Sequence, residues 1–428
     1  MFGADLSYVN EMDDCGAVYR DNGRAEDPYE IFAKHGTNLV RLRLWNDPDW
    51  TEYSTLTDIK RSIRRAKDSG MAVLLDFHYS DDWADPGDQK VPAAWADLSE
   101  DALAEAVYNY TLGTLTELAG EGLYPDMVQV GNETNTEILL PGNVPEDQPI
   151  DWARNAKLLN AGILGVRAAG EQVGETPKIM LHVAQPENVE PWFDDGLAAG
   201  LLDFDVIGMS YYPKWSTRDL DGLEQTIRRL RHKFGKEVVV VETAYPFTLD
   251  GEDAAPNLLG QDSLIEGYPA TLDGQRRYLT DLTQTVLSAD GQGVVYWEPA
   301  WVSTGCSTRW GKGSHWENNT FFSYGDTKAH SGFDFMTATY AAPQEVKLVF
   351  KGAGDGTAYL WADFLGGRDF TLPLEPTAQG YTYATRLPAG MPVEFQLYAD
   401  PALDEPLLGA EMQSLTVGTG NNRYEFEF

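Results

Sequence analysis

The chain has 428 residues, which is more than one ordinary domain needs and enough for a large barrel with a small additional domain. Asp and Glu number 67 against 32 Lys and Arg, and the resulting net charge of −35 excludes nucleic acid and anionic membranes as partners and favours a neutral substrate. Hydrophobic residues make up 43% of the sequence, which excludes wholesale disorder.

No apolar run approaches the roughly 20 residues that span a bilayer. The chain starts directly with a strand-like segment and shows no leader, as expected of a processed exported protein and equally of a cytoplasmic one. Its two cysteines, Cys15 and Cys306, form no metal cluster. They follow the first and the eighth predicted strand, which are neighbours in a closed barrel, so they could form one disulfide or remain two free thiols.

Short apolar, β-branched runs alternate with helix-length amphipathic segments over the first 300 residues. The predicted strands are Phe2–Val9, Asn38–Leu44, Met71–His78, Asp126–Gly131, Lys178–His182, Asp205–Ser210, Glu237–Glu242 and Gly293–Trp297. The predicted helices are Thr57–Ser69, Glu100–Ala119, Trp152–Ala169, Leu220–Phe234 and Leu272–Ser288. This alternation predicts a (β/α)8 TIM barrel over residues 1–340. An open doubly wound sheet would need a glycine-rich phosphate loop, which the sequence lacks.

The pattern changes after about residue 340. Segments with alternating apolar and polar residues are separated by Gly and Pro turns, and no helical period remains. These segments are Gln344–Phe350, Thr357–Phe364, Gly380–Arg386, Pro392–Tyr398 and Arg423–Phe428. We predict a small antiparallel β-sandwich over residues 341–428. It is either a structural cap or a carbohydrate-binding module that uses rings such as Tyr359, Trp361 or Tyr381.

Nearly every predicted barrel strand ends in a residue that can bind or ionise, as expected of a barrel enzyme. Besides Glu133 and Glu242, these strand ends contribute Arg43, Asp76, His78, Asn132, His182, Tyr212 and Trp297, which we expect to bind substrate. Single histidines are more often satisfied core residues, and Trp297 could be core filler.

Glu133 and Glu242 end strands on opposite sides of the predicted barrel. Their carboxyl groups could lie about 5–5.5 Å apart, the separation that a retaining glycosidase needs. We expect Glu133, with a raised pKa, to be the general acid/base and ionised Glu242 to be the nucleophile. We further expect Arg43 to lie under Glu242 and keep it charged, and Asn132 to bind a sugar 2-hydroxyl.

Six stretches resemble glycoside hydrolase family 53, the arabinogalactan endo-β-1,4-galactanases. They read GADLS (3–7), VRLRLWNDP (40–48), LDFHYSDDWADP (75–86), QVGNETN (129–135), VETAYP (241–246) and YWEPAW (296–301). They lie in order and cover roughly residues 2–340, and the third is specific to the family. The resemblance implies a retaining, endo-acting hydrolase of β-1,4-galactan with Glu133 as acid/base and Glu242 as nucleophile.

The resemblance also implies that Arg43, His78, Trp83, Asn132, Tyr212 and Trp297 line the cleft, while Trp301 and Trp316 stack on more distant sugars. Bacterial members often hold calcium between the loops after strands seven and eight. Here the seventh loop, Leu249–Asn257, is acidic but lacks the expected ligand series, so calcium near Asp250, Glu252, Asp253 and Asn257 stays an alternative to no metal. The insertion Cys306–Glu317 could change chain-length preference.

No cofactor is expected to be required. The predicted partner is a neutral plant polysaccharide, and a polymer that cannot cross a membrane implies an extracellular or cell-surface monomer. One rival keeps the barrel and mechanism but cuts mannan or cellulose. Another is a non-catalytic carbohydrate-binding barrel, which would have lost one of the two glutamates. A metal-dependent or Schiff-base barrel would need clustered ligands or a lysine at a strand end.

Overall fold

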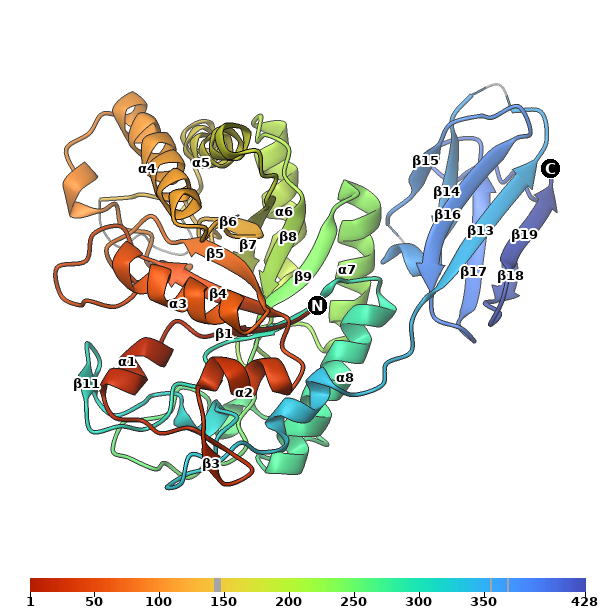
Figure 1. Ribbon diagram of the computed structural model, residues 1–428. Helices are drawn as coiled ribbons and strands as arrows, with labels where there is room; N and C mark the ends of the chain where they lie inside the picture. Colours follow the sequence, from red (N-terminus) through yellow and green to blue (C-terminus); the bar gives the residue numbers. More distant parts are fainter. Residues whose placement is uncertain (142–147, 355, 368) are drawn as a thin grey trace. The chain divides into compact units, whose positions relative to one another are not determined.

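The structure is a computed structural model that describes residues 1–141, 148–354, 356–367 and 369–428 (Figure 1). Within these residues the chain divides into two compact units. The first comprises residues 1–217, 239–280 and 293–338, and the second comprises residues 218–238, 281–292 and 339–428. The predicted boundary at residue 340 stays a prediction, because the second unit also draws on helical segments that precede it. No helix in the described part of the chain is long and apolar enough to cross a membrane.

Eight parallel strands form a closed barrel in the order β1-β10-β9-β8-β7-β6-β5-β4, which confirms the predicted (β/α)8 fold. Their bounds are β1 Phe2–Asp5, β4 Leu39–Leu44, β5 Ala72–Phe77, β6 Met127–Val130, β7 Lys178–Ala184, β8 Val206–Ser210, β9 Glu237–Glu242 and β10 Gly293–Tyr296. Every predicted barrel strand is present. The first is shorter than predicted, because the chain turns into a helix at Val9.

The helices include three that the sequence patterns did not predict. Their bounds are α1 Val9–Asp14, α2 Pro28–Lys34, α3 Leu56–Asp68, α4 Glu100–Gly120, α5 Trp152–Val173, α6 Pro186–Ala198, α7 Leu220–Phe234 and α8 Leu272–Ser288. The unpredicted helices α1 and α2 have six and seven residues, too few for an amphipathic period to show. Helix α6 contains Pro191, which cannot donate a backbone hydrogen bond and argues against a helix in the sequence.

Short elements occupy the loops of the first unit. They are β2 Arg20–Asp21, β3 Arg24–Ala25, β11 Ser307–Thr308 and β12 Gly311–Lys312, and the 3-10 turns Ala93–Trp95, Gln261–Ser263, Glu317–Asn319 and Ser331–Met336. A disulfide joins Cys15, directly after α1, to Cys306, directly before β11, so the disulfide alternative is the observed one.

Two sheets form the sandwich of the second unit, with orders β16-β13-β19 and β15-β14-β17-β18. The strands are β13 Gln344–Lys351, β14 Ala358–Ala362, β15 Leu372–Leu374, β16 Tyr381–Leu387, β17 Pro392–Tyr398, β18 Gln413–Thr416 and β19 Asn422–Glu427, with a 3-10 turn at Asp363–Leu365. Pairing is antiparallel except between β13 and β19, which run parallel. The sheets enclose a common apolar core. Tyr381 is buried in that core, so this ring is unsuited to bind a sugar, whereas Tyr359 and Trp361 are half-buried.

The barrel interior changes from apolar to charged along the strands. Leu39, Leu74, Met127 and Met180 belong to one buried apolar cluster inside the barrel. Two residues further along the same strands come Arg41, Asp76, Gln129 and His182. Since alternate residues of a strand face the same side, these four continue the inward-facing positions. The apolar layer therefore supports a buried polar layer on the side where the strands end.

Candidate active site

The guanidinium of Arg41 organises the polar layer. Nη1 donates to Glu242 Oε1 at 2.6 Å and to Asp5 Oδ2 at 3.0 Å. Nη2 donates to Asp76 Oδ2 at 2.7 Å and to Asn132 Oδ1 at 2.6 Å. All these groups are buried, and the planar guanidinium fork can hold several acceptors in fixed directions at once. Arg41 therefore fixes the position of Glu242 and places a positive charge beside it.

This arrangement corrects one prediction. Arg43, not Arg41, was expected to lie under Glu242. The Arg43 guanidinium instead lies 3.4 Å from Glu298 and among the rings of Tyr8, Trp45 and Trp83, at 4.1 to 5.0 Å from their centroids. Both arginines face the interior from β4, and Arg41 is one step deeper. Alternate residues of β4 face the barrel interior, which makes both arginines candidates, but the sequence does not reveal how deep in the barrel each one lies.

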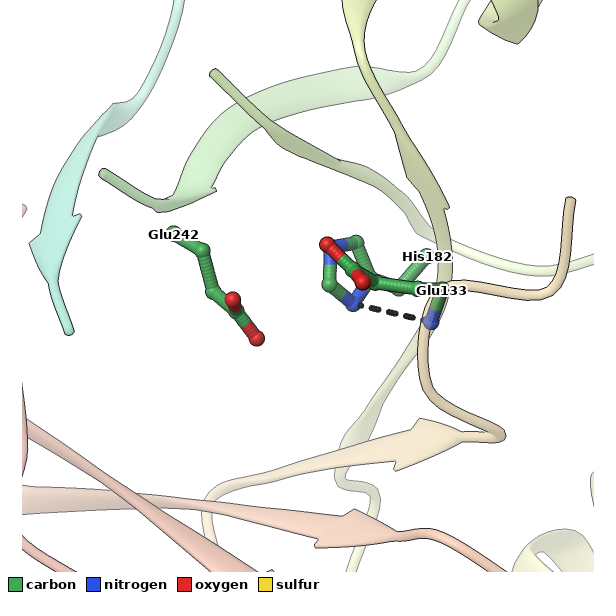
Figure 2. A group of neighbouring side chains, drawn as sticks. All are labelled: Glu133, His182 and Glu242. Carbon is green, nitrogen blue, oxygen red and sulfur yellow. Dashed lines mark hydrogen bonds between the residues drawn. The ribbon is translucent and has the colours of Figure 1, made fainter. Parts of the chain in front are cut away.

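Glu133 and Glu242 point toward one another across the barrel (Figure 2). An oxygen of each carboxyl group and a ring nitrogen of His182 all lie within 4.8 Å of one another. Glu242 is the last residue of β9, and Tyr212 donates a hydrogen bond from its hydroxyl to Glu242 Oε2 at 3.2 Å. This spacing is shorter than the roughly 6.5–9.5 Å that separates the carboxyl groups of inverting glycosidases, and it suits a retaining one.

The backbone at Glu133 is held in a rarely populated conformation. Glu133 has φ 45°, and two residues before it lies Gly131, where φ is 82° and a Cβ would lie 2.7 Å from the Thr134 methyl group. Left-handed φ values of this kind recur at other strand ends around the cavity, namely at Tyr79, Gln185 and Glu298. Such values persist where surrounding contacts enforce them and cluster at functional sites.

Different surroundings separate the two glutamates. Burial, and then the charge of Glu242, raise the pKa of Glu133 well above that of an ordinary glutamate, while a hydrogen bond donated by the Ser210 hydroxyl opposes the rise. Burial also raises the pKa of Glu242, but here the adjacent Arg41 is the strongest opposing influence. Because only Glu242 contacts the guanidinium, it loses its proton first and Glu133 keeps the remaining one.

A cavity of about 1610 Å³ opens above the two glutamates. It is lined by these predicted residues: Arg43, His78, Trp83, Asn132, Glu133, Tyr212, Glu242, Trp297, Trp301 and Trp316. Asp76 and His182 do not line it, so the expectation that they contact substrate directly does not fit the structure. Asp76 pairs with Arg41 and His78, and His182 connects Asn132 to Ser210. Both lie beneath the residues that face the cavity.

Tryptophans form one wall of the cavity. Trp301 stacks on Tyr8 at 3.9 Å between ring centroids, and Trp316 donates from its indole nitrogen to the carbonyl of Trp297 at 3.0 Å. Trp301 and Trp316 expose no more than 2% of their surface, so each offers only an edge or part of a face to the cavity. Trp310, at the tip of the β11–β12 hairpin, is half-exposed and also lines the cavity.

Sequence reasoning missed four residues of this site: Asp5, Arg41, Gln129 and Ser210. Gln129 donates to Asp76 at 2.7 Å and accepts from Arg41 at 3.1 Å, so it completes the layer that Arg41 organises. The signal that could have found Arg41 and Gln129 is a polar residue two positions after a core residue on a barrel strand.

Two groups of residues bear on metal binding. Among the described residues, Glu133, His182 and Glu242 form a cluster of metal-ligand type. Both ring nitrogens of His182 already have hydrogen-bond partners, and the Arg41 charge beside Glu242 opposes a cation. These residues therefore do not fit a metal ion.

The second group lies where calcium was considered. Burial, and then the neighbouring Asp253 carboxyl group, raise the pKa of Glu317 to about 7. Glu317 Oε2 and Asn257 Oδ1 are buried without a hydrogen-bond partner. Glu252 instead accepts a hydrogen bond from the backbone of Gly325. The oxygens that fit a hard cation are thus those of Asp253, Asn257 and Glu317 rather than those of Glu252.

Comparison with known proteins agrees with this geometry. The model of the family described as Glycosyl hydrolase family 53 matches residues 1–336. An arabinogalactan endo-beta-1,4-galactanase of Cellvibrio japonicus is 49% identical over 347 residues, which are 81% of this chain and 92% of that protein. The GH53 catalytic domain of Ignisphaera aggregans superposes with a TM-score of 0.72 at 33% identity, covering 79% of this chain and 95% of its own. A fungal β-1,4-galactanase gives a TM-score of 0.68 at 31% identity, covering 79% of this chain and 99% of its own. The chain belongs to glycosyl hydrolase family 53.

Proposed function

We propose that this protein is a retaining endo-β-1,4-galactanase. The observation that carries the proposal is the pair of facing glutamates, one beside Arg41 and one beside Ser210, at the base of a large open cavity. The relative from Cellvibrio japonicus, which is named an arabinogalactan endo-beta-1,4-galactanase, supports galactan as the substrate.

In the first chemical step Glu242 attacks the anomeric carbon while Glu133 gives its proton to the leaving glycosidic oxygen. The Arg41 guanidinium keeps Glu242 ionised and directs one of its oxygens, and the Tyr212 hydroxyl binds the other oxygen. In the second step Glu133, now a carboxylate, takes a proton from water, which displaces Glu242 from the sugar. Both steps invert the anomeric carbon, so its configuration is retained overall.

Asn132 and the buried layer position these groups. Asn132 accepts from Arg41 and donates to the carbonyl of Ala84 at 2.8 Å, so its amide is held at the cavity surface, where it can bind the 2-hydroxyl of the reacting sugar. Asp76 and His182 act as positioning residues, since each contacts a residue that faces the cavity and neither faces it itself.

Endo action follows from the size of the cavity. Pockets for small molecules are typically about 300–1,000 Å³, and this cavity of about 1610 Å³ exceeds that range. It accommodates several consecutive sugars of a polymer. The neutral galactan side chains of pectin and arabinogalactan suit a protein of charge −35, and a polymeric substrate places a monomeric enzyme outside the cell or on its surface.

Calcium is a structural ion in this proposal. Asp253, Asn257 and Glu317 would hold it through carboxylate and amide oxygens, and it would neutralise the close pair of carboxyl groups. Asp253 also accepts from Ser303 and from the backbone of Ser314. The ion would therefore join the loop after β9 to the loop after β10 that carries the tryptophan wall.

The proposal is tested by reducing-end release from β-1,4-galactan, mannan, xylan and carboxymethylcellulose, with the oligosaccharide products resolved over time. Galactan should be cut into short oligomers from the start of the reaction, and the other polymers should stay intact. Cleavage of mannan or cellulose in place of galactan would refute the proposed substrate and leave the assignment of the two glutamates open to separate tests.

A further inference from the structure

The two sheets of the sandwich have outer faces of different character. Side chains of a sandwich strand alternate between the core and the outside, so an outer face is normally polar. The outer face of the sheet β16-β13-β19 follows this rule, with exposed residues such as Lys347, Thr382 and Glu425. The outer face of the sheet β15-β14-β17-β18 departs from it, because β14 presents Tyr359 and Trp361 there.

Strand register places these rings in an apolar row across the sheet. The other residues of β14 are fully buried in the sandwich core, so Tyr359 and Trp361 between them face outward. Tyr359 is paired with Pro373 of β15 on one side and with Tyr398 of β17 on the other. Tyr398 in turn forms a bridge with Pro406. Directly opposed residues of paired strands have side chains on the same face, so four rings cross the sheet in one row, with Trp361 beside it.

The rings of this row are accessible from outside. Tyr359, Trp361 and Tyr398 are half-buried, while Pro373 and Pro406 are exposed. Within the part of the chain that the structure describes, the hydroxyls of Tyr359 and Tyr398 have no hydrogen-bond partner. Both hydroxyls can therefore bind a ligand that lies on the rings.

The loop beside the row is held in place by a buried amide. Gln396, the cross-strand partner of Trp361, donates to the carbonyl of Gly409 at 3.0 Å and to that of Glu411 at 2.9 Å. Its side chain is 1% exposed, so the loop that precedes β18 packs over it. Rings on a sheet with a fixed border lose little entropy when a ligand binds.

A row of uncharged rings suits a neutral sugar chain. Neighbouring strands lie about 4.8 Å apart, so a row across four strands offers a surface roughly 14 Å long, enough for several linked sugars. The apolar faces of sugars stack on aromatic rings, and the hydroxyls at the ring edges can pair with the tyrosines. The charge of −35 disfavours an acidic polymer on any face of this protein.

We propose that this row, the ring platform (Tyr359, Trp361, Pro373, Tyr398 and Pro406), binds a β-1,4-galactan chain at a site separate from the barrel cavity. The inference rests on the proposed function, which names the polymer, and adds a non-catalytic binding site to it. It favours the carbohydrate-binding alternative for the sandwich over the structural cap. The platform keeps the enzyme on insoluble galactan between successive cuts.

Binding is measured with the full chain carrying Glu242→Gln, which cannot cut the polymer, by affinity electrophoresis in gels that contain soluble β-1,4-galactan. Adding Tyr359→Ala and Tyr398→Ala together should raise the apparent Kd roughly threefold to tenfold. Replacing both tyrosines by Phe keeps the rings and should restore most of the binding. Thr382→Ala, on the outer face of the other sheet, is the matched control and should leave the Kd unchanged. Thermal melts check that each variant is folded.

Because the cavity also binds galactan, the tyrosine variants are assayed as well with Glu242 intact. Their kcat/KM on soluble galactotetraose should equal that of the wild type, while oligosaccharide release from insoluble galactan should fall. Unchanged retardation of the folded double Ala variant, or equal losses on the tetrasaccharide and on insoluble galactan, would overturn the platform. Equal retardation by mannan, or a changed oligomeric state with galactan binding intact, would also overturn it. If the wild type cuts no galactan but its retardation still depends on the two rings, the proposed function fails and the platform stands.

Discussion

The buried layer beneath the two glutamates and the aromatic wall beside them hold their residues by different forces. In the buried layer, Arg41 is fixed by charged hydrogen bonds of 2.6 to 3.0 Å to Glu242, Asp5, Asp76 and Asn132. Beside the layer, Arg43 lies among the rings of Tyr8, Trp45 and Trp83, with the Glu298 carboxylate 3.4 Å away. Two arginines of one strand, two positions apart, thus have separate tasks. The buried layer controls the protonation of the two glutamates, and the aromatic rings control the shape of the cavity. This difference predicts distinct effects of mutation.

Removal of either glutamate should have the largest effect. Glu133→Gln and Glu242→Gln should each lower kcat/KM on galactan at least about 10³-fold, because a neutral amide can neither attack the anomeric carbon nor deliver a proton. Reducing-end assays give the rates, and thermal melts check that each variant is folded. Near-normal turnover in a folded variant would mean that the pair is misassigned.

Exchanging each arginine for lysine distinguishes the role of the buried layer, through Arg41, from the role of the aromatic rings around Arg43. Arg41→Lys should lower kcat about 10²-fold, because lysine cannot hold Glu242, Asp5 and Asp76 in the same directions. Arg41 lowers the pKa of Glu242. Lysine keeps a positive charge but loses the directed hydrogen bond to Glu242, which also lowers the pKa, so Arg41→Lys should raise the pKa of Glu242 and move the acid limb of the pH–rate profile to higher pH.

Arg43→Lys is the matched comparison. The Arg43 guanidinium packs on the rings of Trp83 and Tyr8, so this exchange should disturb the rings and weaken substrate binding. It should leave the acid limb of the pH–rate profile in place. A shift of the acid limb that is as large in Arg43→Lys as in Arg41→Lys would contradict the separation of tasks.

Ser210 should have a smaller effect, confined to the acid/base. The hydrogen bond from Ser210 lowers the pKa of Glu133. Ser210→Ala should therefore raise that pKa and move the basic limb to higher pH, with less than about a tenfold loss of rate at the optimum. Ser210→Thr keeps the hydroxyl and should retain the wild-type profile. A basic limb that moves to lower pH in Ser210→Ala would be inconsistent with this role.

The smallest effect should come from the loops that carry the wall. Millimolar calcium should raise the Tm of the wild type by about 2–5 °C over a chelator-treated sample, because an ion that binds only the folded state stabilises it. Glu317→Gln should abolish this increase, and Glu252→Gln should keep it. Identical melting curves with calcium and with chelator would argue against the ion.

The fold could be predicted almost completely from the sequence, and the site only in part. The eight barrel strands are apolar runs buried on both faces, and this pattern is local enough to read. The assignment of Arg41 and Arg43 was wrong because depth within the barrel depends on register between strands. For the same reason Asp76 and His182 could be located at strand ends but not placed beneath the cavity surface.

Loops account for the remaining differences. The disulfide of Cys15 with Cys306 spans 291 residues, and only closure of the barrel brings its ends together. Helix α6 was missed because of its internal proline, Pro191.

The central claim is that surroundings give two identical side chains different roles, with Glu242 as nucleophile and Glu133 as acid/base. Azide rescue on an activated galactoside substrate tests it most directly. With Glu133→Ala, azide should attack the covalent intermediate and give the β-glycosyl azide, and with Glu242→Ala it should replace the nucleophile and give the α-azide. The reverse stereochemistry in the two variants would show that the roles are exchanged.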